Sequence, residues 1–128
     1  HLHVRVDFGG RLAGGAQEFS FERSEFAERV ARARTFCFYE DLERMRSLGL
    51  AKGGSLENAI VFRGGIPVNP GGLRFRDEVA RHKALDALGD LALGGTIVGT
   101  YRAEKPGHVL NHRLLVKLFS DPSHFRIV

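Results

Sequence analysis

The sequence predicts an α+β domain of two layers, in which helices pack on one face of a mainly antiparallel sheet and a β-α-β insert extends the fold. Three observations favour this class. Short segments of alternating apolar residues, typical of strands, are interspersed with segments whose apolar residues recur at helical spacing. Their order is β-β-α, then β-α-β, then α-β-α, which implies helices layered on a sheet. No internal repeat or linker is visible, so residues 1–128 are expected to form a single domain.

Length and composition exclude several classes of protein. The 128 residues are 43% hydrophobic and 27% charged, which is typical of a globular chain and excludes a disordered one. No apolar run is long enough to cross a bilayer, so no transmembrane segment is expected. Cys37 is the only cysteine, which excludes an intrachain disulfide and favours a reducing, cytoplasmic location. The net charge of +4 permits an anionic partner, but no aromatic residues interleave with the basic ones, so no nucleic-acid partner is expected.

The chain opens with a predicted hairpin and a helix. Residues 2–8 alternate apolar and polar side chains, and residues 17–21 do so again after a Gly-rich turn, which predicts two antiparallel strands. Ser24 is a good N-cap for a helix over about 24–33, whose apolar residues recur at helical spacing.

Residues 36–62 are expected to form the β-α-β insert. An aromatic extended segment leads into a short amphipathic helix over 41–48, which Gly49 ends, and a strand over 58–62 follows. We expect most of its apolar residues in the core, and composition leaves a wall for a lipid chain open as the alternative. These residues are Phe36, Phe38, Leu42, Met45, Leu50, Ile60 and Phe62.

The longest predicted helix covers residues 72–91 and carries polar side chains on one face. Glu78, His82, Asp86 and Asp90 follow one another at intervals of four residues, and the opposite, apolar face should pack on the sheet. An imidazole and a carboxylate at this spacing can meet above a helix as metal ligands do. Most such pairs are solvated, however, and zinc normally needs at least three protein ligands, so spacing alone leaves both interpretations open.

The remaining segments complete the order of elements. The Gly/Pro-rich residues 64–72 lack the Gly-Lys-Ser/Thr ending of a phosphate-binding loop and are interpreted as a connector. Residues 96–103 alternate as a strand, and Pro106-Gly107-His108 opens a last helix that Asp121-Pro122 stops.

Five motifs occur in the order of one known family, and the chain resembles that family from about Phe26 to Leu118. It is similar to the C-terminal domain of the zinc-dependent UDP-3-O-acyl-N-acetylglucosamine deacetylase of lipid A biosynthesis. The first hairpin carries less of the resemblance. The motifs are Ala33-Arg34-Thr35-Phe36, Gly53-Gly54-Ser55, Leu73-Arg74-Phe75, Arg81-His82-Lys83-Ala84-Leu85-Asp86-Ala87-Leu88-Gly89-Asp90 and Gly107-His108-Val109-Leu110-Asn111-His112.

The resemblance implies a Zn²⁺ cofactor and a set of site residues. His82 and Asp86 match two of the family's three zinc ligands, His108 matches the general acid, and Asp90 matches the carboxylate that orients that acid. The resemblance further assigns the oxyanion-holding hydroxyl to Thr35, the cation that meets the substrate's charge to Lys83, and substrate-binding residues of the acyl-chain passage to Phe36, Cys37, Gly54 and Ser55.

The family's third zinc ligand and its glutamate base come from an N-terminal domain, and this sequence contains no matching Glu-His pair. The lack of an initiator Met suggests that the chain was cut from a longer protein, so we expect the isolated chain to be inactive. Two residues depart from the family pattern: Pro106 stands where Ser is common, and Cys37 stands where Gly is usual.

Two other functions remain as alternatives. The first is a free-standing, non-catalytic relative that binds a nucleotide-sugar or an acyl group. The second is a basic phosphate or nucleic-acid binder, which rests only on the net charge. Of the other histidines, His1, His3 and His124 are expected at the surface, and His112 at the surface or beside the site.

Overall fold

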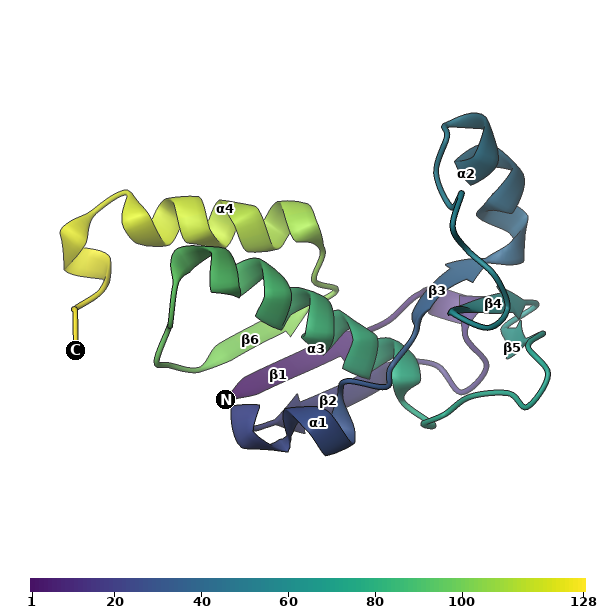
Figure 1. The fold of residues 1–128 in the computed structure, drawn as a ribbon, viewed down its shortest axis with the longest axis horizontal. Helices are drawn as coiled ribbons and strands as arrows, with labels where there is room; N and C mark the ends of the chain where they lie inside the picture. The colour runs from purple at the N-terminus through teal and green to yellow at the C-terminus, as the bar shows by residue number, and fades with distance from the viewer.

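The strands form two separate three-stranded sheets. In this computed structural model, which describes residues 1–128, the strand orders are β2-β1-β6 and β3-β4-β5 (Figure 1). Each sheet contains one antiparallel pair, β1-β2 or β4-β5, and one parallel pair, β1-β6 or β3-β4. The α+β class is confirmed, with two small mixed sheets in place of one mainly antiparallel sheet. The strands are β1 (Leu2–Val6), β2 (Gln17–Phe21), β3 (Thr35–Phe38), β4 (Ala59–Arg63), β5 (Ile66–Pro67) and β6 (Tyr101–Glu104).

Helices α3 and α4 are layered on the first sheet, and α2 lies beside the second sheet. Helix α3 crosses β1 and β2, α4 lies along the side of α3, and α2 projects with the second sheet at the other end (Figure 1). No helix is both long enough and apolar enough to cross a membrane. The bounds are α1 (Phe26–Arg29), α2 (Leu42–Ser47), α3 (Glu78–Leu91) and α4 (His108–Phe119).

Several elements are shorter than the sequence predicts. The helix expected over 24–33 is only α1, and a capping box between Glu22 and Glu25 begins the preceding 3-10 turn in place of a Ser24 cap. Helix α3 begins at Glu78 instead of residue 72, because Gly71 and Gly72 adopt positive φ angles that a helix does not allow. The strand expected over 96–103 is β6, which starts only at Tyr101.

The core lies between the first sheet and α3. In β1 and β2, alternate residues pair across the ladder and point inward, as Val4 does opposite Phe19 and Leu2 opposite Phe21. Helix α3 presents Val79 and three alanines to them, and these small side chains let the helix axis approach the sheet closely. One face of the second sheet continues this core. The contributing residues of α3 and the second sheet are Val79, Ala80, Ala84, Ala87, Phe38, Ile60 and Phe62.

Glu78 does not lie on the solvated face that its spacing predicts. Its side chain is 0% exposed, and Oε1 accepts hydrogen bonds from the backbone N and the Nε of Arg34, both at 3.0 Å. Oε2 accepts from the backbone N of Arg74 at 2.6 Å. Glu78 therefore anchors the start of α3 to the segment that enters β3.

Candidate active site

The exposed side of α3 brings an imidazole and a carboxylate together. His82 Nε2 lies 3.2 Å from Asp86 Oδ1, and both side chains are largely shielded from solvent. Lys83 Nζ donates to Asp86 Oδ2, also at 3.2 Å. The four-residue spacing places the two side chains on consecutive turns, as the helical period requires.

The surroundings of His82 fix which ring nitrogen carries hydrogen. Nδ1 lies 3.2 Å from the backbone O of Ala33, which can only accept, so Nδ1 is the donor. In a neutral ring, Nε2 then points a lone pair at Asp86 Oδ1, and two acceptors at this distance need a proton or a cation between them. A backbone carbonyl on the far nitrogen is the usual partner of a metal-binding histidine.

This donor set fits zinc as part of its coordination shell. With ligand bonds of about 2.0–2.2 Å, neighbouring ligands of a tetrahedral zinc lie about 3.3 Å apart, which agrees with the separation of Nε2 and Oδ1. No group of three or more His, Cys, Asp or Glu side chains converges within the chain. His82 and Asp86 could therefore supply two ligands of a zinc site, which normally has at least three protein ligands.

Asp86 has the electrostatics of a carboxylate held ionised. Burial raises its pKa, but the hydrogen bond and charge of His82 and the charge of Lys83 outweigh burial, so the pKa lies below its ordinary value. An ionised oxygen beside an imidazole is a suitable pair of donors for a divalent cation.

One turn further along α3, Asp90 meets the first residue of α4. Gly107 has an extended backbone and caps α4, so the helix begins at His108. The Nδ1 of His108 donates to Asp90 Oδ2 at 2.8 Å, and it lies 3.0 Å from Oδ1. The Asp90 side chain is 13% exposed and the His108 side chain 64% exposed. With Nδ1 occupied by Asp90, the Nε2 of this exposed ring is available to a ligand.

Two residues at this pair were not predicted from the sequence. Asn111 donates from Nδ2 to Asp90 Oδ2 at 2.8 Å, and its Oδ1 accepts from Tyr101 Oη at 2.7 Å. Asn111 follows His108 by three residues and therefore lies on the same side of α4, which is the signal that could have identified it. His112 lies farther away, with Nε2 3.7 Å from Asp90 Oδ1.

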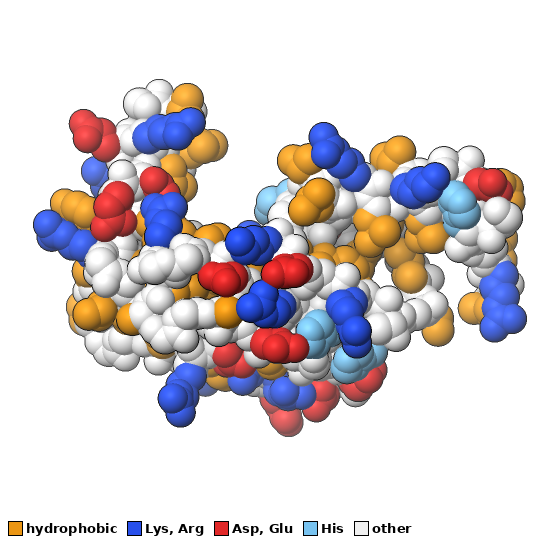
Figure 2. All heavy atoms as spheres, turned by 180° about the vertical axis from the view of Figure 1, so that it is seen from behind, with side chains coloured by type: hydrophobic (Ala, Val, Ile, Leu, Met, Phe, Trp, Pro, Cys, Tyr) orange, Lys and Arg blue, Asp and Glu red, His pale blue; other side chains and the backbone are white.

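The other histidines lie outside this group. His1 contacts Glu22, His3 contacts Ser20 and Glu18, and His124 contacts the backbone of α4. Charges of both signs are interspersed on the face of the molecule in Figure 2, where Arg and Lys side chains alternate with Asp and Glu. That face carries no continuous basic surface of the kind a polyanion binder requires.

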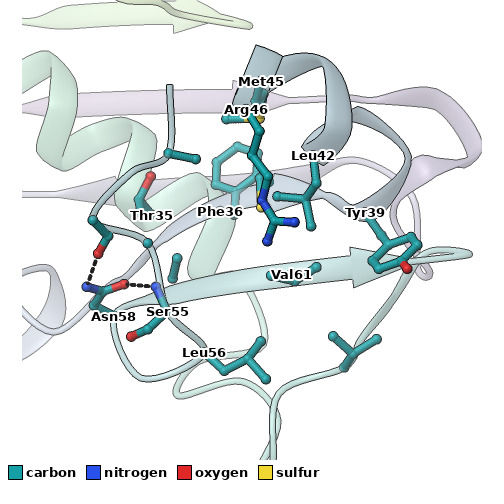
Figure 3. A pocket seen from close by; sticks show the side chains of 16 residues that line it. Thr35, Phe36, Tyr39, Leu42, Met45, Arg46, Ser55, Leu56, Asn58 and Val61 are labelled. Atoms are coloured by element: carbon teal, nitrogen blue, oxygen red, sulfur yellow. Dashed lines mark hydrogen bonds between the residues drawn. The ribbon is translucent and has the colours of Figure 1, made fainter. Parts of the chain in front are cut away.

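A large cavity lies between α2 and the second sheet. It has a volume of about 680 Å³ and a mainly apolar wall. Figure 3 shows Leu42, Met45 and Arg46 of α2 on one side and Val61 of β4 on another. The predicted insert residues Thr35, Phe36, Cys37, Gly54 and Ser55 all line it.

Several apolar residues of the insert that were expected in the core lie at the cavity or at the surface instead. Phe38, Ile60 and Phe62 are buried in the core as predicted, but Leu42 and Met45 line the cavity and Leu50 is exposed. The reason is the separation of α2 from the second sheet, which leaves space where the sequence pattern predicts packing.

Strand β3 connects the cavity with the His82–Asp86 pair. Thr35 and Cys37 face the cavity beside their β4 partners, whereas Phe36 also contacts the side of α3. The Phe36 ring centroid lies 6.3 Å from that of His82, and Lys83 Nζ lies 5.6 Å from the Phe36 ring centroid. Residues on β3 can therefore reach the candidate metal pair and the cavity at once.

The chain is similar to one family over almost its whole length. The family described as UDP-3-O-acyl N-acetylglycosamine deacetylase matches residues 1–120. A UDP-3-O-acyl-N-acetylglucosamine deacetylase of Anaeromyxobacter dehalogenans is 54% identical over 96% of this chain and 41% of its own length. The protein of that name in Myxococcus xanthus is 49% identical over 91% of this chain and 38% of its own length. The chain thus spans about two fifths of the length of these relatives.

Proposed function

This chain belongs to the UDP-3-O-acyl N-acetylglycosamine deacetylase family, and we propose that it is the C-terminal part of a zinc-dependent amidohydrolase. The substrate we propose is UDP-3-O-acyl-N-acetylglucosamine, from which the whole enzyme removes the N-acetyl group in lipid A biosynthesis. The names of the relatives support the reaction. Because the chain spans about two fifths of their length, further site residues of the proposed enzyme could come from outside this chain.

One observation carries the proposal: three residues on successive turns of α3 form two acid-base pairs, His82–Asp86 within the helix and Asp90–His108 with the first residue of α4. The first pair would hold Zn²⁺, together with a third ligand from the N-terminal domain. Zinc, when bound, polarises the amide carbonyl and lowers the pKa of a bound water. The base that takes the proton from this water is also expected from the N-terminal domain.

His108 is proposed as the general acid. An amine is a poor leaving group unless it is protonated, so amide hydrolysis needs a proton donor at the nitrogen. Asp90 holds Nδ1 of the ring, which fixes its orientation and leaves Nε2 to deliver the proton.

Thr35, Lys83 and the cavity are proposed as substrate contacts. The Thr35 hydroxyl would help to hold the oxyanion, and the Lys83 ammonium would meet the negative charge of the substrate beside the metal. The acyl chain would lie in the apolar cavity, where Phe36, Cys37, Gly54 and Ser55 line its path. A cytoplasmic location, which we propose as well, rests on the single cysteine.

An assay of acetate release by the full-length protein tests this proposal. We expect turnover that a chelator abolishes and Zn²⁺ restores. His108→Ala should lower kcat at least about 100-fold, the usual size of an acid-base contribution, and His82→Ala should abolish the dependence on Zn²⁺ together with turnover, because it removes a proposed ligand. His124→Ala removes an exposed histidine beyond the C-terminal end of α4 and should leave turnover unchanged. Substrate binding without turnover would instead support the non-catalytic alternative.

A further inference from the structure

The Asp90 carboxylate is the end of a longer chain of hydrogen bonds. Tyr101 Oη donates to Asn111 Oδ1 at 2.7 Å, and Asn111 Nδ2 donates to Asp90 Oδ2 at 2.8 Å. Asn111 is 2% exposed, and Tyr101 is partly buried against the core. The chain therefore joins β6, α4 and α3 and ends at the His108 ring.

Chemistry fixes the direction of every hydrogen in this chain. An ionised carboxylate only accepts, so Asn111 must turn its NH₂ toward Asp90 and its carbonyl toward Tyr101. The Tyr101 hydroxyl must then donate. Burial and the charge of Asp90 raise the pKa of Tyr101, which keeps this hydroxyl protonated. All the hydrogens point toward Asp90, and the remaining donor to that carboxylate is Nδ1 of His108.

Asn111 also determines which of two histidines forms a hydrogen bond with Asp90. His108 and His112 are one turn apart on α4, and both face the same carboxylate. The Asn111 bond holds Oδ2 toward His108 at 2.8 Å and leaves Oδ1 at 3.7 Å from His112, which is too long for a hydrogen bond. Without Asn111, the carboxylate is free to rotate toward His112 or toward solvent.

We propose that Asn111 and Tyr101 are positioning residues that act through Asp90: they hold Nδ1–H of His108 on the carboxylate, which makes Nδ1–H the tautomer of the neutral ring and Nε2 the nitrogen that takes up a proton and delivers it to the substrate. The claim about turnover rests on the proposed function, whereas the claim about the tautomer rests on the hydrogen bonds alone. Partners behind a functional histidine typically change activity by 10- to 100-fold when they are removed.

The test is ¹⁵N NMR of the histidine rings in the full-length protein, together with steady-state kinetics. Asn111→Leu should remove the protected Nδ1–H signal of His108 and lower kcat about 10-fold, with KM nearly unchanged. Tyr101→Phe keeps the ring and removes only the hydroxyl, so it should weaken the same signal and lower kcat less. Ser120→Ala is the control, since it also removes one hydrogen-bonding hydroxyl, but at the exposed C-terminal end of α4, opposite to His108.

The outcomes separate positioning from a structural role. If Asn111 only stabilises α4, its variant will lower the melting temperature while the His108 signal and kcat below that temperature stay at wild-type values, which overturns the proposal. If Asn111→Leu does not fold, Tyr101→Phe decides, and an unchanged His108 signal in it also overturns the proposal. Altered signals in a protein whose wild type has no deacetylase activity would refute the proposed function and leave the positioning role supported.

Discussion

At the scale of single residues, the site depends on polar side chains that are buried or half-buried and fully paired. No buried side-chain nitrogen or oxygen lacks a hydrogen-bond partner. The pair of Glu78 and Arg34 is the most buried example, and it joins the first turn of α3 to the entrance of β3. Since Thr35 follows Arg34 directly, this pair helps to fix the start of β3, where Thr35 lies.

Stability should therefore depend on pH through Glu78. Burial raises the pKa of Glu78, but hydrogen bonds from Arg34 and Arg74 outweigh burial and hold the pKa below its ordinary value of 4.5. A carboxyl with a lowered folded pKa stabilises the fold above its unfolded pKa, and this contribution is lost as pH falls below about 4.5 through the folded value. Glu78→Gln should cost about 3 kcal/mol near neutral pH and flatten the acid side of the stability profile.

Urea unfolding between pH 3 and pH 7 measures this effect. The matched control is Glu104→Gln, which breaks the exposed pair with Arg5 and should cost less than about 1 kcal/mol. Equal losses of unfolding free energy in the two variants would show that burial does not make the Glu78–Arg34 pair more stabilising than an exposed pair.

Cys37 is expected to influence the preferred acyl chain in the full-length enzyme. Its side chain lines the cavity beside its β4 partner Val61, at a position where the resemblance leads us to expect Gly. Cys37→Gly should shift kcat/KM toward longer or bulkier acyl chains by about 10-fold, since a group of this size in an apolar pocket is worth about 1–3 kcal/mol. Cys37→Ser keeps nearly the same volume and should keep the wild-type profile. An unchanged profile in Cys37→Gly would exclude the steric explanation.

At the scale of elements, α3 is the support of the whole site. Its inner face packs on β1 and β2 through alanines, and its outer face carries the His82–Asp86 pair and the Asp90 carboxylate that holds His108 of α4. Any displacement of this helix from the sheet moves the metal pair relative to Thr35 and Phe36 of β3. The close approach of helix and sheet therefore has a functional consequence.

Overpacking this contact should destabilise the chain. Ala84 is fully buried, and Ala84→Leu inserts three carbon atoms between α3 and the first sheet, which typically costs 1–3 kcal/mol, so about 2 kcal/mol is expected. Ala92→Leu, at the exposed end of the helix, should change stability by less than about 0.5 kcal/mol. Urea midpoints compare the two, and similar midpoints would mean that the interface has room for a larger residue.

At the scale of the whole molecule, the proposed site would be divided between this chain and the rest of the proposed enzyme. The chain holds two candidate ligands and a candidate acid, and no third ligand group converges with them. The cavity, in contrast, is lined by residues of this chain, nearly all of them in the insert.

The isolated chain should accordingly bind Zn²⁺ weakly and show no deacetylase activity, since zinc sites normally have at least three protein ligands. Calorimetry with Zn²⁺ on the wild type and on His82→Ala, together with the acetate assay, tests this. The weak Zn²⁺ binding of the wild-type chain should be absent in His82→Ala. Tight binding or clear turnover by the isolated chain would show that the missing ligand and base lie within these residues.

Much of the fold could be predicted from the sequence because local periodicity records which face of an element is apolar. The hairpin, the order of the elements and the pairing of His82 with Asp86 all follow from spacing of two or four residues. The motifs of the resemblance pointed to His108 as the partner of Asp90, although the two residues are 18 positions apart.

Only the tertiary structure decided which polar residues are buried and what they contact. Glu78 has the same spacing as His82 and Asp86, yet it is buried against Arg34, which lies 44 positions earlier, and no local pattern encodes a contact over such a separation. Asn111 and Tyr101 likewise become part of the site only because α3, α4 and β6 meet. The split of the strands into two mixed sheets, and the cavity beside the second, depend on long-range pairing, which periodicity alone does not specify.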